Sequence, residues 1–152
     1  MIYFDTAYVA KCYLNEHGSP EVRELAIEYG RVACCEYGRI ELAATFHRNL
    51  RQKSITPAEF RLLWKQFDLD EENRIWSWLP VHHELLAAVT NRFRKLASSV
   101  YLRSADALHL TCAVQHGFKK IHSNDVHLLA AAKAFGIKGV NVVSAVKVAG
   151  QK

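Results

Sequence analysis

Five short apolar runs alternate with longer amphipathic stretches along the chain. We expect these runs to form buried strands at 2–4, 32–35, 75–81, 121–122 and 140–143. The stretches between them carry apolar residues at helical spacing, so helices separate successive strands. Such helices act as crossover connections, and crossovers join parallel strands. The pattern therefore predicts an α/β protein, with a three-layer α/β/α fold around a central parallel five-stranded sheet.

Local capping signals set the helix boundaries. Ser19-Pro20 places a capping serine before a proline, which favours a helix start, and Gly30 ends that helix. The segment 56–59, TPAE, is a capping box with proline at the first helical position. The other expected helices span 7–16, 39–52, 84–98, 103–116 and 125–135. The segment from about 39 to 67 is expected to form a helical hairpin that projects beside the strand ends.

The size and composition of the chain fit one domain over residues 1–152. With 50% hydrophobic and 11% aromatic residues, the chain can bury a substantial core, which excludes a disordered chain. Polar residues interrupt every apolar stretch before it reaches membrane-spanning length. The first residues also lack the basic and apolar regions of a signal peptide. We therefore expect a soluble cytoplasmic protein without membrane contact.

Four cysteines and eight histidines show no zinc-binding pattern. All four cysteines lie in apolar segments without C-x-x-C spacing, so we expect buried reduced thiols. The net charge of +5 is modest. A basic surface around an acidic pocket suits a phosphodiester substrate, but a merely solubilising basic surface explains this charge equally well.

Four acidic residues, Asp5, Glu41, Asp106 and Asp125, lie at predicted strand ends or near the starts of the following helices. Taken singly, each aspartate has a simpler explanation as a helix cap or a first-turn charge. Glu41 lies inside a helix between apolar neighbours and fits that explanation poorly. Because the ends of parallel strands share one edge of a sheet, we expect all four carboxylates to converge there.

Such a cluster has an electrostatic consequence. Two unit charges about 5 Å apart repel by roughly 3 kcal/mol at an effective dielectric constant of about 20. Three or four carboxylates therefore stay ionised together only beside a cation. Mg²⁺ and Mn²⁺ prefer oxygen ligands, and a water bound to such a metal can attack a phosphodiester. The residues thus indicate a divalent-cation site with nuclease chemistry.

The residues around these acids resemble those of PIN-domain ribonucleases. The segment 103–109, RSADALH, is similar to their R-x-x-D-A-x-H segment, and Ser123-Asn124-Asp125 is similar to their T-x-D. Asp5-Thr6 after the first strand and Glu41 after the second complete the pattern in the same order. The resemblance spans the whole chain and fits the VapC-type toxins of type II toxin–antitoxin systems.

This resemblance implies a Mg²⁺- or Mn²⁺-dependent endoribonuclease that acts as a toxin. It implies that Asp5, Asp106 and Asp125 bind the metal and that Glu41 acts on it through water. The residues implied to support these acids are Thr6, Ser123, Arg103 and His109. The implied partners are an RNA substrate, a second copy of the chain in a homodimer, and a small antitoxin protein that covers the active-site groove.

Several neighbours of the acids have a second interpretation. His109 either steadies a carboxylate or is a hydrogen-bonded core histidine, and Arg103 either contacts phosphate or is a solvated first-turn arginine. Glu36 stands where family members often carry serine or threonine, and it either adds a ligand or faces solvent. Asn124 and His127 flank the last acid where further acids can occur, which leaves the number of metal ions open at one or two.

An apolar stripe on the expected hairpin also has two interpretations. Phe60, Leu63, Trp64 and Phe67 recur at helical spacing, which is typical of a core-facing surface. The alternative is a groove for an amphipathic helix of the antitoxin, with Phe60 and Trp64 in it and the helix at 22–29 as its other wall.

Two other function classes fit the same residues less well. A catalytically silent RNA-binding or interaction module with this fold would carry the acids without using them. An aspartyl-phosphate hydrolase built on Asp5 needs a second acid two residues later, where this chain has Ala7. It also needs a lysine near the last strand, for which Lys138 is the nearby candidate.

Overall fold

The strands of the computed structural model, which describes residues 1–143, are parallel and form two sheets. Strands β1 (Ile2–Tyr3), β2 (Val32–Cys35) and β3 (Trp76–Leu79) form the first sheet, in the order β1-β2-β3. Strands β4 (Lys120–His122) and β5 (Lys138–Val140) form the second. A parallel bridge between Phe4 and His122 connects β1 to β4. The five strands predicted for one sheet are therefore divided in two at this bridge.

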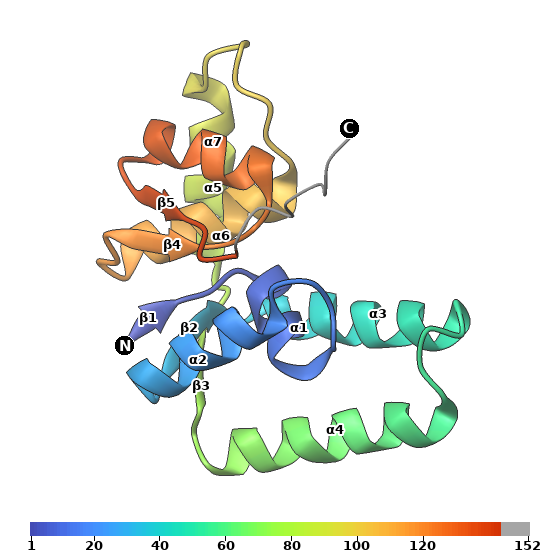
Figure 1. The fold of residues 1–152 in the computed structure, drawn as a ribbon. Coiled ribbons are helices and arrows are strands. Elements are labelled where there is room, and N and C mark those ends of the chain that lie inside the picture. The colour runs from blue at the N-terminus through green and yellow to red at the C-terminus, as the bar shows by residue number, and fades with distance from the viewer. Residues whose placement is uncertain (144–152) are drawn as a thin grey trace, which may run out of the picture.

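Helices lie between the strands, as the hydrophobic pattern predicts. They are α1 (Thr6–Tyr13), α2 (Ser19–Tyr29), α3 (Tyr37–Arg51), α4 (Pro57–Glu72), α5 (His83–Lys95), α6 (Ser104–Gln115), α7 (Val126–Ala132) and the 3-10 helix η1 (Lys133–Phe135). Figure 1 shows α5, α6 and α7 gathered at the top of the view, with α1 to α4 below them. The structure confirms the α/β fold class with three layers. Within residues 1–143, no helix is both long and apolar enough to cross a bilayer.

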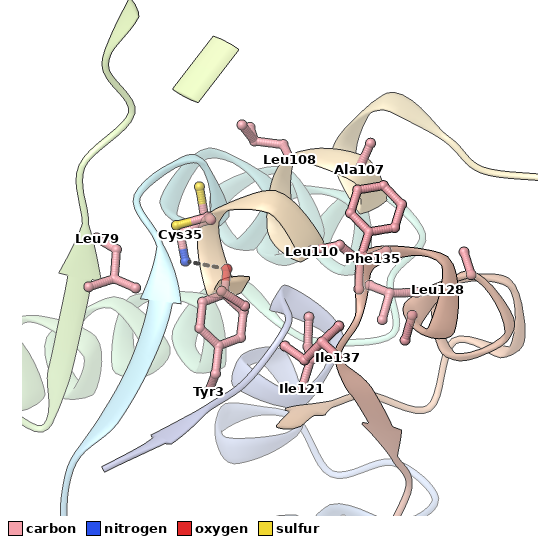
Figure 2. Packing of buried hydrophobic residues seen from close by; sticks show 14 of the residues in the cluster. Tyr3, Cys35, Leu79, Ala107, Leu108, Leu110, Ile121, Leu128, Phe135 and Ile137 are labelled. Atoms are coloured by element: carbon pink, nitrogen blue, oxygen red, sulfur yellow. Dashed lines mark hydrogen bonds between the residues drawn. The ribbon is translucent and has the colours of Figure 1, made fainter. Parts of the chain in front are cut away.

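Alternate residues of the strands face two separate hydrophobic cores. The core beside α5, α6 and α7 receives Tyr3, Ala33, Cys35 and Leu79. The core beside α1 to α4 receives Ile2, Phe4, Val32, Cys34 and Trp76. Successive side chains of a strand point to opposite faces, so each strand supplies both cores. In the first core, drawn in Figure 2, the Cys35 N–H donates to the Tyr3 hydroxyl at 3.1 Å.

The helix boundaries follow local chemistry closely at some ends and depart from it at others. Thr56 caps α4 in the predicted capping box, with its side chain accepting from the Glu59 N–H at 3.2 Å. By contrast, α3 begins at residue 37 rather than 39, α5 ends at 95 rather than 98, and the helix expected over 125–135 ends as a 3-10 turn. These differences of a few residues are ordinary fraying and capping effects.

The last strand was predicted two residues too late. It lies at Lys138–Val140, not 140–143. A charged residue and a glycine open it, so the apolar pattern misses its start. A Cβ on Gly139 would lie 3.1 Å from the Leu129 Cα and 3.2 Å from its carbonyl oxygen, so the backbone of α7 leaves little room for a side chain here. Beyond the strand, the Val142 N–H donates to the Tyr8 hydroxyl at 2.8 Å instead of continuing the ladder.

Candidate active site

The parallel strands bring the segments that carry the acids to one edge of the fold. Asp5 follows β1, α3 with Glu41 follows β2, and Asp125 lies just beyond β4. Helix α6, which carries Asp106, packs against both β2 and β4. The segments that carry the four acids thus meet where the order of the strands places them.

Asp5 is fixed from two sides and is almost completely buried, with 5% of its surface exposed. One carboxylate oxygen accepts from the Tyr8 N–H at 3.0 Å and so caps α1. The other accepts from the Ser123 hydroxyl at 2.5 Å. Burial raises the pKa of the Asp5 carboxyl to about 6, although the Ser123 hydrogen bond acts in the opposite direction.

Glu41 belongs to a second hydrogen-bonded group. Its Oε2 accepts from the Thr6 hydroxyl at 2.6 Å and lies 2.8 Å from His109 Nε2. The other ring nitrogen of His109 lies 3.2 Å from the Tyr3 hydroxyl. His109 is 2% exposed, so the structure supports its interpretation as a hydrogen-bonded core histidine that also steadies a carboxylate.

The charges of Glu41 and His109 stabilise one another. Burial alone would raise the pKa of Glu41, but its contacts with His109 and Thr6 outweigh this effect and lower it. Burial opposes the charged form of His109 as well, yet Cys34 and Glu41 raise its pKa well above the ordinary value. The arrangement therefore favours an imidazolium, in which both ring nitrogens donate hydrogen bonds.

A glycine allows α3 to approach this group. A Cβ at Gly38 would lie 2.7 Å from Cys34 Sγ and 2.9 Å from Thr6 Oγ1. Contacts this short require the neighbours to shift, and the backbone of β2 holds one of them in place. Glycine at position 38 thus brings the first turns of α3, and with them Glu41, against the end of β1 and β2.

Arg103 holds the remaining two acids together. Its Nε donates to Asp106 Oδ2 at 2.8 Å and its Nη2 to Asp106 Oδ1 at 3.2 Å, which is a bidentate pair. The same Nη2 also donates to Asp125 Oδ2. The Arg103 side chain remains 51% exposed, whereas that of Asp106 is 10% exposed. The guanidinium thus neutralises two carboxylates from the solvent side.

Asp125 caps α7 and also belongs to the group of acids around Arg103. Its Oδ1 accepts from the N–H groups of His127 and Leu128 at 2.9 and 3.0 Å, at the start of α7. Burial acts to raise the pKa of Asp125, but the Leu128 N–H and Arg103 outweigh it and lower the pKa. Its own N–H donates to Ser123 Oγ at 2.8 Å, which links it to Asp5. The capping and cluster interpretations are therefore compatible.

Within residues 1–143, no three His, Cys, Asp or Glu side chains are arranged to hold a metal ion. The guanidinium of Arg103 lies between Asp106 and Asp125 and pairs with both. The oxygen donors nevertheless suit a hard cation, because carboxylates and an amide oxygen are the ligands such a cation prefers. In the same described part, Asn124 Oδ1 is buried without a hydrogen-bond partner. A cation or its water would satisfy that oxygen.

A cleft of about 350 Å³ opens beside the acids, between α1 and α3. Thr6, Glu41, Arg103 and Asn124 line the end nearest the cluster. Residues further along α3 also line it, namely Thr45, Arg48 and Asn49. The sequence reasoning missed these three, although their spacing from Glu41, at four, seven and eight residues, would have revealed a shared helix face.

Two other neighbours lie outside the cluster. Glu36 is exposed and makes no capping hydrogen bond at the start of α3, which agrees with its solvent-facing interpretation. The His127 ring packs against Tyr101, with ring centroids 4.6 Å apart. The His127 side chain is exposed, and in the described part of the chain its ring contacts Tyr101 and not an acid.

The apolar stripe on α4 divides between core and surface. Phe67 is buried, whereas Phe60 and Trp64 are half-buried and pack against the core of α1 to α4. Phe60 and Trp64 also line a shallow cavity of about 410 Å³. Every residue lining this cavity belongs to α4, so α2 does not supply the second wall expected at 22–29.

Comparison with known families agrees with this arrangement. The chain matches the PIN domain over residues 2–134, a range that contains all four acids. A search of curated proteins found no match. Since the matched range covers most of the sequence, the chain belongs to the PIN domain family.

Proposed function

We propose that this chain is an endoribonuclease that depends on Mg²⁺ or Mn²⁺ and acts in the cytoplasm as the toxin of a toxin–antitoxin pair. PIN domains are generally metal-dependent nucleases. The observation that carries the proposal is the hydrogen-bonded connection from Asp5 through Ser123, Asp125 and Arg103 to Asp106, at the end of an open cleft.

The residues of the chain divide the work of such a site. Asp5, Asp106 and Asp125 would hold the cation directly, and Glu41 would act on it through water. When bound, the cation supplies a nucleophilic water and stabilises the leaving oxygen of the phosphodiester. Ser123 orients Asp5, and Thr6 with His109 orients Glu41. The carboxylate oxygens of Asp5 and Glu41 are therefore positioned before any ligand arrives.

Arg103 has a second position in this proposal. A divalent cation held by Asp106 and Asp125 would supply the positive charge that the half-exposed guanidinium supplies now, and Arg103 would then be free to leave the acids. A guanidinium forms bidentate hydrogen bonds with phosphate as readily as with carboxylate. Arg103 would then contact the phosphate beside the bond that is hydrolysed. The same side chain would thus pair with the acids before the cation binds and with phosphate afterwards.

One observation favours the alternative of a catalytically silent module. In the described part of the chain the acids do not form a ready metal site, and Arg103 neutralises two of them without any metal. A protein that only binds RNA or a partner would keep the acids in this state. The two functions differ in whether RNA is cleaved when a divalent cation is added.

A cleavage assay tests the proposal. The purified full-length chain is incubated with structured and unstructured RNA in Mg²⁺ or Mn²⁺, and again after addition of EDTA. Asp5→Asn is expected to reduce cleavage about 100-fold or more, because it removes a carboxylate from the metal site. Asp68→Asn, which changes an exposed acid on α4, is the matched control and should cleave as the wild type does.

The possible results separate the two candidates. Cleavage that survives EDTA or Asp5→Asn contradicts a metal-dependent nuclease built on these acids. RNA binding without cleavage under every metal condition supports the silent module. Cleavage that requires metal and is lost in Asp5→Asn alone supports the nuclease.

The proposed partners are a small antitoxin and a second copy of the chain. The supporting observation for the antitoxin is the half-buried pair Phe60 and Trp64 at the shallow cavity on α4, since apolar anchors of this kind receive amphipathic helices. A short open reading frame immediately upstream of the gene would identify the antitoxin. Phe60→Glu and Trp64→Glu should then weaken its binding, and because both side chains also pack against the core, circular dichroism must first show that each variant is folded. Sedimentation equilibrium should give twice the chain mass of 17.3 kDa for a homodimer.

A further inference from the structure

We infer that the cleft between α1 and α3 binds an unpaired RNA strand, and that Arg48 contacts a phosphate of a neighbouring nucleotide. This inference rests on the proposed nuclease function, because the acids form one end of the same cleft. It adds a substrate-binding residue, Arg48, that lies outside the PIN-type motifs and outside the acid cluster.

The face of α3 that borders the cleft extends away from the acids. Glu41, Thr45, Arg48 and Asn49 all line the cleft, at positions that share one side of the helix. Seven residues separate Glu41 from Arg48, which is about 10 Å along the helix axis at 1.5 Å per residue. A phosphate that contacts Arg48 is therefore not the one beside the acids, and belongs to another nucleotide of the same strand.

Arg48 is a cation of this cleft whose charge is available. Within residues 1–143, it makes no side-chain hydrogen bond and no ion pair, and it is exposed. Lys11 on the opposite wall differs, since it is 5% exposed, donates to the His17 carbonyl at 2.7 Å and lies 3.5 Å from Glu16. Arg103 is held by two aspartates. Of the three cations Lys11, Arg48 and Arg103 among the described residues, Arg48 is therefore the one whose charge is free to bind an anion in the cleft.

The rest of the cleft suits a nucleotide more than an apolar ligand. Asn49 Nδ2 donates to the Thr45 carbonyl at 2.9 Å, which fixes the amide and leaves its oxygen as an acceptor for a ribose hydroxyl. Ala7 and Ala10 form the wall from α1, and their short side chains leave room for a sugar or base. An unpaired strand can turn its bases out into such a cleft, whereas a duplex keeps them paired and stacked and displays mainly its 2′-hydroxyls and phosphates.

A simpler explanation for Arg48 is that it complements the dipole at the C-terminal end of α3. Arg51 lies in the same last turn and would serve that purpose equally. It does not line the cleft. Arg48 and Arg51 both lie in the last turn of α3, but of these two only Arg48 lines the cleft. Comparing substitutions at the two positions therefore separates a phosphate contact from a general charge effect.

The test is RNA binding by the full-length chain in the Asp5→Asn background, which prevents cleavage, with Mg²⁺ present. Fluorescence anisotropy of a labelled single-stranded oligoribonucleotide is measured at several salt concentrations. Arg48→Ala should weaken binding about 5- to 10-fold and reduce the slope of log affinity against log salt by about 0.7, the value for one lost phosphate contact on a single strand. Arg48→Lys should retain most of the affinity, and Arg51→Ala should change it less than about twofold.

Each outcome bears on one proposal at a time. If Arg48→Ala binds as tightly as its parent, if Arg51→Ala loses as much, or if no RNA binds at all, the cleft assignment is wrong. Metal-dependent cleavage by the wild type would still support the nuclease in any of these cases. Conversely, Arg48-dependent RNA binding by a wild-type chain that never cleaves RNA supports the cleft and contradicts the nuclease.

Discussion

The acid cluster consists of an inner network and an outer network that are held in different ways. The inner network joins Tyr3, Thr6, Glu41 and His109, with Asp5 and Ser123 beside them. The outer network joins Arg103, Asp106 and Asp125. The first depends on buried hydroxyl and imidazole groups that the fold positions, whereas the second depends on one arginine that is half exposed.

This difference separates the part of the site that the fold fixes from the part that a ligand can rearrange. Buried hydrogen bonds are costly to break, because each leaves a polar group without a partner. An exposed ion pair contributes little, because water screens the charges and the long side chain loses freedom. We therefore expect inner substitutions to affect folding and outer substitutions to affect cation binding.

The largest effect is expected for His109→Ala. The change removes one hydrogen-bond partner each from the Tyr3 hydroxyl and from Glu41, which keep the Cys35 N–H and the Thr6 hydroxyl. It also opens a cavity in the core, so the free energy of unfolding should fall by about 2–4 kcal/mol. Urea denaturation measures this. His83→Ala, an exposed position at the start of α5, should change it by less than about 0.5 kcal/mol. Equal effects of the two substitutions would contradict a special role of the inner network.

The next effect concerns pH and Asp5. Its pKa is about 6 in the folded chain against an ordinary 3.8, so between these values the folded state binds more protons than the unfolded state. The Asp5 contribution to stability is thus complete below pH 4 and is lost as the pH rises through 6. The loss is at most about 3 kcal/mol.

Asp5→Asn should remove that part of the pH dependence in EDTA. Unfolding curves at pH 4 and pH 7 for the wild type, Asp5→Asn and the surface control Asp68→Asn measure it. Between pH 4 and pH 7, the free energy of unfolding of the wild type and of Asp68→Asn should fall by the same amount, which is larger than the fall in Asp5→Asn. A pH dependence that is unchanged in Asp5→Asn contradicts the assignment.

A smaller effect is expected for Ser123→Ala. Its hydroxyl donates to Asp5 and accepts from the Asp125 N–H, so it connects the two networks. Its loss should lower the free energy of unfolding by about 1–2 kcal/mol. It should also raise the pKa of Asp5 further, because this hydrogen bond lowers that pKa. Carboxyl NMR titration follows the pKa, and Ser98→Ala at an exposed position is the control.

The smallest effect on stability is expected for Arg103→Gln, about 1 kcal/mol, because the arginine is half exposed and the glutamine amide still offers a donor to the largely buried Asp106. Although Arg103→Gln should lower the free energy of unfolding slightly, it should strengthen cation binding. Removal of the guanidinium from between Asp106 and Asp125 should tighten Mn²⁺ binding several-fold in calorimetry without RNA. Arg94→Gln, an exposed arginine on α5, should leave Mn²⁺ affinity unchanged. Weaker Mn²⁺ binding by Arg103→Gln would contradict competition between the arginine and the cation.

The sequence predicted more of the fold than of the site. Apolar runs separated by amphipathic stretches were sufficient to identify the strands β1 to β4, because both periods are local properties of the chain. The strand at Lys138–Val140 was misplaced because its glycine is explained by a contact with Leu129 and not by its own neighbours. The division into two sheets was also missed, because sheet pairing depends on twist between strands that no local pattern records.

For the site, the sequence by itself determined which residue types lie at the strand ends and that they match the PIN motifs. Only the tertiary structure decided that Arg103 neutralises two of the acids, that His109 pairs with Glu41 rather than filling the core alone, and that Arg48 faces the cleft. The physical reason is that strand order follows from chain connectivity, whereas ion pairs depend on side-chain conformations. Those conformations are set by packing between residues more than 100 positions apart, such as Asp5 and Ser123, which are 118 positions apart.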